Sequence, residues 1–486
     1  MLKTFCQSSF RSFSATAKES GALNVFKPLQ QYAPTFYTQG DNIKPLYQPS
    51  EFYSQLKSNI LSAKERVFIA ALYIGQNEQE LVDTLRTALE NKPTLKVNVL
   101  IDCLRGTRVS KGQSSATLLL PLIRDFPDQI QIAMYHTPDL TGILKKTLPP
   151  RFNESIGLMH LKVYGFDNSV MLSGANLSTD YFTNRQDRYI MFKDQPELST
   201  YYHDLVELIS KCSYQLEQGK KGDEQPFALT STVGMADPVR QSQEYKEQVT
   251  EKLEQFIMNA LDKSSDTSSN DKADTAILPV IQMGPFNIRQ DERLTLALLN
   301  LANSQAPSKW TIDLTSGYFN FTEKYKQVIL QTKARFRFLT ASPEANGFFN
   351  SKGVSRFLPP AYTFIERQFY RQVKKSGRQD DISIEEYKRQ DWTYHAKGLW
   401  ISLYDQKWPS ATMIGSPNFG QRSSERDLEA QALVVTENTQ LRELLYKEVD
   451  LLHQHSEIVS KETFDKIDRR VPNGVKIATA FVKTML

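Results

Sequence analysis

Two histidine–lysine pairs in this 486-residue chain have the residue types and the spacing for phosphoryl chemistry. His160 is followed two positions later by Lys162, and His395 is followed in the same way by Lys397. In an extended segment alternate side chains lie on one face, so each imidazole and its ammonium would lie together. An imidazole can attack phosphorus, and an ammonium can neutralise a non-bridging oxygen. Two such pairs would supply one nucleophile and one general acid–base.

An asparagine and an acid follow each pair at matching distances. Asn176 and Asn418 are 242 positions apart, and so are Asp187 and Glu429. An amide can donate to a phosphoryl oxygen, and a carboxylate can fix the tautomer of an imidazole. One His-x-Lys match could occur by chance, but the whole series repeated in register indicates a duplicated site. We expect each acid to orient the histidine of the opposite half.

Similar strand–helix–strand units precede the two pairs. In the first unit a strand-like run at 67–73 is followed by a helical stretch at 78–90 and a second strand-like run at 95–102. The second unit has the same order, with a strand at 310–318, a helix at 321–331 and a strand at 335–340. Alternating strands and helices predict an α/β fold with two mixed sheets. They also predict a division into a leader (1–20), a first half (21–214), a helical and Ser/Asp-rich connector (215–275) and a second half ending in helices (276–486).

The leader has the composition of a targeting segment. It is rich in serine and contains Lys3, Arg11 and Lys18, with no acid before Glu19. A basic, acid-poor start of this kind is typical of a mitochondrial transit peptide. We therefore leave it out of the expected fold.

Composition excludes several classes of function. The 59 basic and 55 acidic side chains give a net charge of +4, which argues against a nucleic-acid partner. Cys6, Cys103 and Cys212 have no CxxC spacing, so neither a disulfide framework nor a zinc site is expected. No cluster with metal-ligand spacing is present, and no apolar run is long enough to span a bilayer.

The paired motifs resemble the signature of the phospholipase D superfamily, HxK(x)4D followed by GSxN. The matching residues are His160, Lys162, Asp167, Gly174 and Asn176, then His395, Lys397, Gly415, Ser416 and Asn418. The chain departs from the pattern at Ser402, where Asp is expected, and at Ala175, where Ser is expected. The resemblance implies a duplicated mixed-sheet sandwich with its active site between two pseudo-symmetric halves, and a supporting role for Asp167.

Longer stretches are similar to the eukaryotic phosphatidylglycerophosphate synthases. They cover 148–154, 159–169, 181–189, 394–400 and 415–420. This resemblance implies transfer of a phosphatidyl group from CDP-diacylglycerol to glycerol 3-phosphate, the committed step toward cardiolipin. It implies a peripheral place on the matrix side of the mitochondrial inner membrane. The alternatives are a phosphatidylserine synthase, a phosphodiesterase or nuclease that uses water, and an inactive membrane scaffold.

On this reading the motif residues take separate roles. His160 would form a phosphatidyl-histidine and displace CMP, and His395 would then activate the acceptor hydroxyl. The lysines and asparagines would stabilise the five-coordinate phosphorus. No cofactor is required, although a divalent cation such as Mg²⁺ could accompany the diphosphate. The sequence does not indicate an oligomeric state.

Anionic substrates and a lipid surface require further residues. Basic candidates for phosphate contact are Arg105, Arg108, Lys111, Lys145, Lys146 and Arg151. Ser316 and Tyr318, at the end of a second-half strand, could line the pocket. The stretches 140–148 and 474–486 mix apolar residues with lysines, as segments at a membrane interface do.

Overall fold

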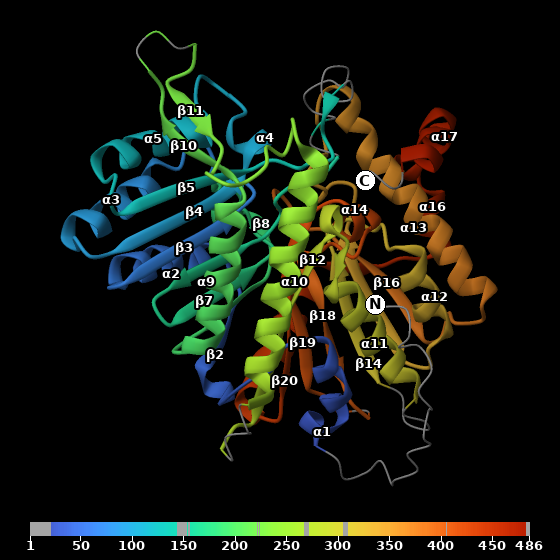
Figure 1. Cartoon of the computed structure of the whole chain (residues 1–486). Helices are drawn as coiled ribbons and strands as arrows, with labels where there is room; N and C mark the ends of the chain where they lie inside the picture. The colour runs from blue at the N-terminus through green and yellow to red at the C-terminus, as the bar shows by residue number, and fades with distance from the viewer. Residues whose placement is uncertain are drawn as a thin grey trace.

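The computed structural model describes residues 21–142, 153, 156–220, 222, 224–266, 272–304, 310–404 and 406–482. Two mixed sheets stand side by side, with helices on their outer faces and a further layer of helices between them (Figure 1). The leader lies outside the described residues, as does the Ser/Asp-rich stretch 267–271.

The first sheet has the strand order β11-β10-β5-β4-β3-β6-β7-β9-β2. Its strands are β2 (Ile43–Leu46), β3 (Arg66–Ala71), β4 (Lys96–Asp102), β5 (Ile130–Tyr135), β6 (Val163–Phe166), β7 (Ser169–Ser173), β9 (Tyr189–Phe192), β10 (Tyr214–Gln218) and β11 (Phe227–Thr230). Neighbours β3, β4 and β5 are parallel, so the chain returns between them through helices. The helices on this outer face are α2 (Pro49–Ser62), α3 (Gln79–Asn91) and α5 (Ser115–Asp125).

The second sheet repeats this plan, with the order β1-β12-β20-β19-β18-β14-β15-β16-β21. Its strands are β1 (Phe36–Thr38), β12 (Thr275–Met283), β14 (Thr311–Ser316), β15 (Arg335–Ala341), β16 (Ile382–Tyr387), β18 (Lys397–Ser402), β19 (Ala411–Gly415), β20 (Leu428–Thr436) and β21 (Ser456–Ile458). The helices that follow or cover them include α1 (Ala22–Phe26), α11 (Gln290–Ser304), α12 (Glu323–Gln331), α13 (Leu358–Lys375), α16 (Lys461–Asp465) and α17 (Asn473–Val482). The two predicted strand–helix–strand units are therefore confirmed as β3–α3–β4 and β14–α12–β15.

A shared core joins the two halves. Helices α9 (Pro196–Lys211), α10 (Ser242–Asp266) and α15 (Thr439–His453) contribute apolar side chains to it. Phe68 of the first sheet and Val434 of the second belong to the same buried cluster as Tyr202 of α9 and Leu445 of α15. Burial of this continuous apolar surface holds the halves in a fixed relation, which a site between them requires.

The division of the chain differs from the sequence prediction at both ends of the first half. Residues 22–38 were assigned to that half, but Val25 and Phe26 pack in the core of the second, and β1 pairs with β12. The predicted connector begins with β10 and β11, which extend the first sheet. The hydrophobic pattern of a short segment predicts that it is buried but does not say which sheet it is buried against. None of the described helices is both long and apolar enough to cross a bilayer.

A buried arginine ties the two sheets together beside the motifs. Arg188 is fully buried at the start of β9, and its guanidinium donates to Met413 O at 2.7 Å and pairs with Glu448 at 2.9 Å. The guanidinium also stacks 3.7 Å from the ring centroid of Trp400. Gly398 is required here, because its φ is +130° and a Cβ would lie 2.1 Å from the guanidinium. The sequence interpretation did not identify Arg188 as a residue that joins the sheets.

Candidate active site

Short backbone bridges between the halves position the two histidines. His160 donates its backbone N–H to Leu428 O at 2.8 Å, and Leu428 donates to Leu158 O at 2.8 Å. On the other side, β17 (Thr393–Tyr394) pairs with β8 (Arg185–Gln186), and His395 donates to Gln186 O at 2.8 Å. Each histidine is thus held by the backbone beside the acid of the opposite half. The lysine–histidine motifs stand at the entry to β6 and β18 rather than within long strands.

The acid of each half pairs with the histidine of the opposite half. His160 Nδ1 lies 2.9 Å from a Glu429 carboxylate oxygen, and His395 Nδ1 lies 2.7 Å from Asp187 Oδ2. This is the pairing expected from the sequence. A carboxylate at Nδ1 favours the tautomer that carries its proton there and leaves the Nε2 lone pair available to attack phosphorus or accept a proton. At His395, Lys397 Nζ also lies 2.8 Å from the same Nδ1.

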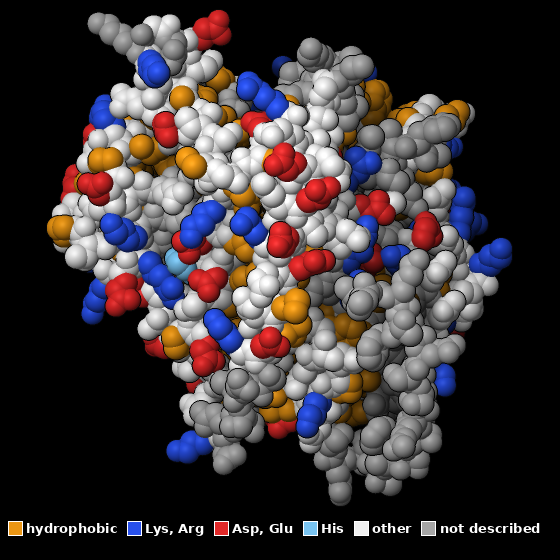
Figure 2. All heavy atoms as spheres, in the orientation of Figure 1, with side chains coloured by type: hydrophobic (Ala, Val, Ile, Leu, Met, Phe, Trp, Pro, Cys, Tyr) orange, Lys and Arg blue, Asp and Glu red, His pale blue; other side chains and the backbone are white. Residues whose placement is uncertain are grey.

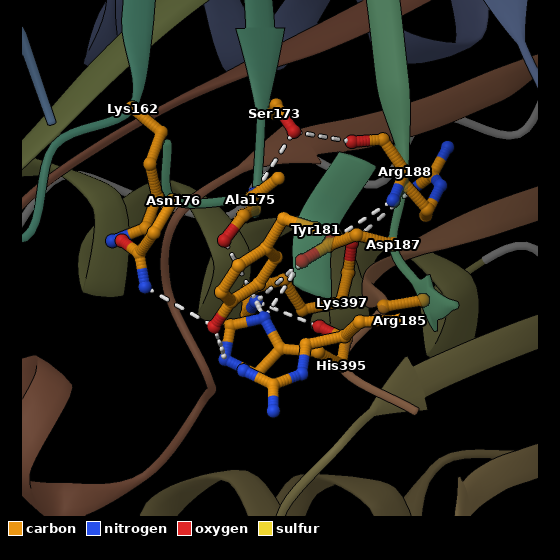
Figure 3. Close-up of polar contacts among 12 residues, drawn as sticks. Lys162, Ser173, Ala175, Asn176, Tyr181, Arg185, Asp187, Arg188, His395 and Lys397 are labelled. Atoms are coloured by element: carbon orange, nitrogen blue, oxygen red, sulfur yellow. Dashed lines mark hydrogen bonds and ion pairs between the residues drawn. The ribbon is translucent and has the colours of Figure 1, made fainter. Parts of the chain in front are cut away.

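Both lysines are buried between the histidines. Lys162 Nζ donates to His160 O at 2.7 Å, and Lys397 Nζ donates to His395 O at 2.7 Å. Lys397 also lies 3.5 Å from Asp187 Oδ2 (Figure 3). Gly174 permits this approach, since a Cβ there would meet Asp187 Oδ1 at 2.4 Å and Lys397 Nζ at 2.6 Å. The glycine of the motif is therefore explained by packing around the charges.

The two asparagines carry unused hydrogen-bonding capacity. Among the described residues, Asn176 Oδ1 and Asn418 Oδ1 are buried with no partner. Asn176 donates from Nδ2 to the Tyr181 hydroxyl at 3.1 Å (Figure 3). A buried amide atom without a partner costs free energy, and at a site this is typical of a group kept for a ligand. The unpaired atoms are hydrogen-bond acceptors, so they suit a donor group of a ligand such as a hydroxyl, whereas a phosphoryl oxygen would need the Nδ2 group of each asparagine.

Burial sets the protonation of the imidazoles. It lowers the pKa of His395 to about 3, with Lys397 acting in the same direction. It also lowers the pKa of His160 well below the usual value, again helped by the neighbouring lysine, Lys162. Both imidazoles are consequently neutral at physiological pH, as a nucleophile and a general base must be.

The charged partners respond to the same burial. It lowers the pKa of Lys162 to about 7 and lowers that of Lys397. Glu429 has its pKa raised to about 7 by burial, whereas Lys397 and His395 outweigh burial and lower the pKa of Asp187. An incoming phosphate would favour the protonated lysines, because it brings negative charge into a site of low dielectric.

The two halves differ at one position beside the histidines. The Tyr181 hydroxyl lies 3.4 Å from His395 Nε2. Its counterpart 242 positions later is Ser423, whose hydroxyl donates to Glu429 instead. Among the described residues, none forms a hydrogen bond with His160 Nε2. The open nitrogen on His160 suits a nucleophile, and the occupied one on His395 suits proton transfer.

Aromatic and basic side chains form a wall next to His395. The ring of Tyr318 lies edge-on to the imidazole, with a centroid distance of 5.8 Å, and stacks on Tyr362 at 5.2 Å. Arg185 stacks on Tyr181 at 4.6 Å. Tyr318 thus stands at the site, as predicted. Ser316 is buried and donates to Asn418 O at 3.2 Å, so it supports the asparagine turn.

One residue of the motif, Asp167, lies away from the histidines. It follows Lys162 by five residues, roughly 16 Å along an extended strand. Its carboxylate accepts the backbone N–H groups of Lys64, Glu65 and Arg66. Asp167, a motif residue expected to support the site, therefore has a structural role at the far end of the sheet and lies outside the catalytic group.

The basic candidates separate into two groups. Arg108 and Lys111 are exposed on the loop after β4, and Arg105 stacks on Tyr73 at 4.6 Å. Their place at the strand ends agrees with the prediction, but only Arg105 is partly buried. Lys145, Lys146 and Arg151 lie outside the described residues, as does most of 140–148. The sequence interpretation missed Arg422, which pairs with Asp427 at 3.2 Å on the His160 side.

Ser402, the departure from the motif, lies at the far end of β18 and is buried. We expect Ser402→Asp to keep kcat within about tenfold of the parent, a change below 1.4 kcal/mol in transition-state energy, because the position is remote from the reacting atoms. Steady-state kinetics checks this, with thermal unfolding as a separate measure of the buried charge. A larger loss of kcat in a folded variant would place position 402 in the site's chemistry.

Some of these side chains could also hold a cation. His160, Asp427 and Glu429 bring ligand atoms within 4.8 Å of one another. However, Arg422 and Lys162 place positive charge at the same point, which disfavours a divalent ion there. A second group, His203, Asp204 and Glu207, lies on α9 away from the motifs.

Comparisons with known proteins agree with this geometry. Residues 56–209 match the family model described as cardiolipin synthase, PLD-like domain. The mitochondrial CDP-diacylglycerol–glycerol-3-phosphate 3-phosphatidyltransferase of Gallus gallus is 42% identical over 94% of this chain and 86% of its own length. The Homo sapiens protein of the same name is 41% identical over 94% and 85%, and that of Saccharomyces cerevisiae 39% over 94% and 91%.

A solved structure supports the fold at full length. The phosphatidylserine synthase of Haemophilus influenzae superposes with a TM-score of 0.70, covering 96% of this chain and all of its own. Its sequence identity is 19%, so this likeness concerns architecture alone. The duplicated phospholipase D-like fold expected from the motifs is thereby confirmed.

Proposed function

Because the chain belongs to the CDP-diacylglycerol–glycerol-3-phosphate 3-phosphatidyltransferase family, we propose that its crossed His–Lys pairs transfer a phosphatidyl group from CDP-diacylglycerol to glycerol 3-phosphate. The products are phosphatidylglycerophosphate and CMP, which places the reaction on the route to cardiolipin. The observation that carries the proposal is the pair of neutral, acid-oriented imidazoles held on opposite sides of one buried cluster.

The first step forms a covalent intermediate on His160. Its Nε2 attacks the phosphatidyl phosphorus, an N–P bond forms, and the bond to the CMP oxygen breaks with the electron pair leaving on CMP. Lys162 and Lys397 compensate the charge that develops on the non-bridging oxygens, and Asn176 and Asn418 donate their amides to the same oxygens. Glu429 stabilises the imidazolium through Nδ1.

The second step transfers the lipid to the acceptor. His395 accepts the proton of a glycerol 3-phosphate hydroxyl, whose oxygen attacks phosphorus while the N–P bond breaks and returns its electrons to His160. Asp187 stabilises the protonated His395 by accepting a hydrogen bond from its Nδ1–H. Arg185 and Arg422, on opposite sides of the site, provide the positive charge that the phosphate of the acceptor needs.

The proposed location of the protein is the mitochondrial inner membrane. Relatives in chicken and human bear mitochondrial names, and the leader has the composition of a transit peptide. We place the protein on the matrix surface of the inner membrane, where CDP-diacylglycerol would reach it. A divalent cation would bind through the diphosphate of the substrate rather than through a protein cage.

The deciding experiment offers alternative acceptors to one donor. Purified protein is incubated with CDP-diacylglycerol and glycerol 3-phosphate, serine or water, and the lipid product is identified. Glycerol 3-phosphate should be used and should release CMP in equal amount. Phosphatidylserine as the main product would indicate the alternative synthase, and phosphatidic acid would indicate a phosphodiesterase. Repeating the assay with EDTA tests the cation.

The pH dependence of the first step should be bell-shaped, with Glu429 setting the acid limb and Lys162 the alkaline limb. The phosphates of CDP-diacylglycerol do not titrate near neutrality, so kcat/KM for this substrate reports groups of the free protein. His160 stays neutral below its usual pKa of about 6.5. Lys162, with a pKa of about 7, gains charge as the pH falls. Glu429, whose pKa burial raises to about 7, loses its charge over the same range and with it the carboxylate that orients His160. We therefore expect kcat/KM to pass through a maximum near pH 7 and to be about threefold lower at pH 6 and at pH 8.

The alkaline limb of this profile tests the lowered pKa of Lys162. A lysine with its ordinary pKa of about 10.4 would stay charged, and kcat/KM would not fall between pH 7 and pH 8. Initial rates at low CDP-diacylglycerol across this range provide the measurement, with unfolding followed at each pH. A constant kcat/KM between pH 7 and pH 8 in folded protein would show that burial does not bring the pKa of Lys162 into this range.

A further inference from the structure

Two exposed segments flank the active site at the same end of the two sheets. The first follows β4, whose last residue, Asp102, accepts the backbone N–H of Met159 at 3.0 Å, next to His160. The second follows β15, and its residue Ala345 accepts the backbone N–H of Tyr394 at 2.8 Å, next to His395. Both segments therefore begin beside a reacting histidine, one in each half.

These segments expose apolar side chains at their tips. Val109 on the first is 56% exposed, and Phe349, Val354 and Phe357 on the second are 39–63% exposed. Ile477 of α17, which packs against α13, is 64% exposed. Figure 2 shows hydrophobic side chains at the surface over α17 and the upper end of α13. We call Val109, Phe349, Val354, Phe357 and Ile477 the apolar rim.

Basic residues accompany the rim, and acids are missing from its sequence. Residues 345–365 contain Lys352 and Arg356 and no Asp or Glu. Residues 103–124 contain Arg108 and Lys111 among four basic residues and again no acid. In a chain with 55 acidic side chains, such stretches indicate a surface that meets negative charge. Exposed aromatics between cations are typical of a protein face that enters the headgroup region of a membrane.

A continuous aromatic path connects this surface to the chemistry. The ring of Phe348, next to Phe349, lies 5.9 Å from that of Tyr318. Tyr318 in turn lies 5.8 Å from His395. A substrate with two acyl chains must keep its tails in an apolar phase while its diphosphate reaches the histidines. These contacts place the rim two aromatic rings away from His395, so a headgroup at the bilayer surface would lie close to the histidines.

We propose that the apolar rim, with Lys352, Arg356, Arg108 and Lys111, docks the protein on an anionic phospholipid bilayer with the active-site mouth facing the lipid. The inference rests on the proposed function only for the identity of the lipid that enters. It stands beside the contacts predicted over 140–148, most of which lies outside the described residues, and over 474–486, of which the structure describes the part in α17.

The test is binding to vesicles rather than turnover. Full-length protein is sedimented with vesicles of phosphatidylcholine alone or mixed with phosphatidylglycerol. Lys352→Gln with Arg356→Gln should weaken binding to the mixed vesicles about 25-fold at low salt, about fivefold for each charge. Phe349→Ser with Phe357→Ser should weaken binding to both kinds of vesicle by about tenfold.

A matched control lies at the opposite end of the first sheet. Leu61 is 45% exposed, and Lys64 is exposed near Asp167, so Leu61→Ser with Lys64→Gln changes an equivalent pair remote from the mouth. This control should bind vesicles as the parent does. The proposal would be overturned if the rim variants bound vesicles as tightly as the parent, or if the control weakened binding as much as the rim variants do. A shift in self-association by the rim variants, seen in sedimentation velocity, would instead assign the rim to a second copy and overturn it.

Activity on a soluble substrate keeps the two proposals separate. A short-chain CDP-diacylglycerol below its micelle concentration needs no bilayer. The rim variants should turn it over at the parental rate, because they leave the histidines, lysines and asparagines intact. Parent protein that binds vesicles but never uses this donor would overturn the proposed function while leaving the docking surface in place.

Discussion

A His395→Ala variant should release a burst of CMP and accumulate lipid-bound protein, yet transfer the lipid to glycerol 3-phosphate about 10²–10⁴ times more slowly than the parent. A His160→Ala variant should do neither. The leaving CMP is a phosphate whose second pKa is about 6, so it departs with little help from an acid. The acceptor is an alcohol, which is a poor nucleophile until a base removes its proton. His395 therefore matters mainly in the second step.

The structure gives this asymmetry a physical basis. His395 Nε2 already faces the Tyr181 hydroxyl at 3.4 Å, and the ring of Tyr181 packs edge-on against the imidazole at 5.2 Å. In the other half Ser423 occupies the matching position and leaves His160 Nε2 open among the described residues. A phosphorus atom can approach His160 more directly than His395, whereas a hydroxyl already lies where His395 would take a proton.

Rapid-quench measurement of CMP, together with the acid and base stability of lipid label on the protein, checks the assignment. Label on His160→Ala protein with none on His395→Ala protein would reverse the two roles. Absence of label from both, with turnover in the parent, would point to direct displacement by the acceptor. His203→Ala, a change on α9 outside the site, provides the matched control and should behave as the parent does.

The sequence allowed the gathering of the motif residues and the pairing of each acid with the histidine of the opposite half to be predicted, because the duplication preserves spacing. The equal 242-residue separations of the asparagines and of the acids place equivalent groups in equivalent turns. The crossed pairing of Asp187 with His395 follows from backbone bridges between segments more than 200 residues apart. Such bridges leave no local pattern, so the duplication alone suggested them.

Other parts of the site depend on packing that sequence spacing does not encode. Arg188 resembles any strand-end arginine in the sequence, but burial against Trp400 and Glu448 makes it the tie between the sheets. Asp167 belongs to the motif by spacing, yet the direction of β6 takes it to the opposite end of the sheet, where it caps three backbone N–H groups. Residues 22–38 cross to the second half because their apolar partners are there.

Replacing either motif lysine by methionine should lower kcat about 10²–10³-fold while the protein still folds. Lys162 and Lys397 are fully buried ammonium groups, and burial lowers the pKa of each. Such a group is costly in the empty protein and becomes favourable when negative charge develops beside it. Its contribution should therefore be larger in the transition state than in the bound substrate, and that difference appears in kcat.

The control must remove a buried lysine from outside the site. Lys326 of α12 is also buried and pairs with Glu323, so Lys326→Met separates the cost of losing a buried cation from the cost to catalysis. Kinetics and thermal unfolding are measured for all three variants. Near-parental kcat with only a raised KM in Lys162→Met or Lys397→Met would make that lysine a ground-state binder. Lys397→Met should additionally slow the acceptor step, since Lys397 lies 3.5 Å from the Asp187 oxygen that orients His395.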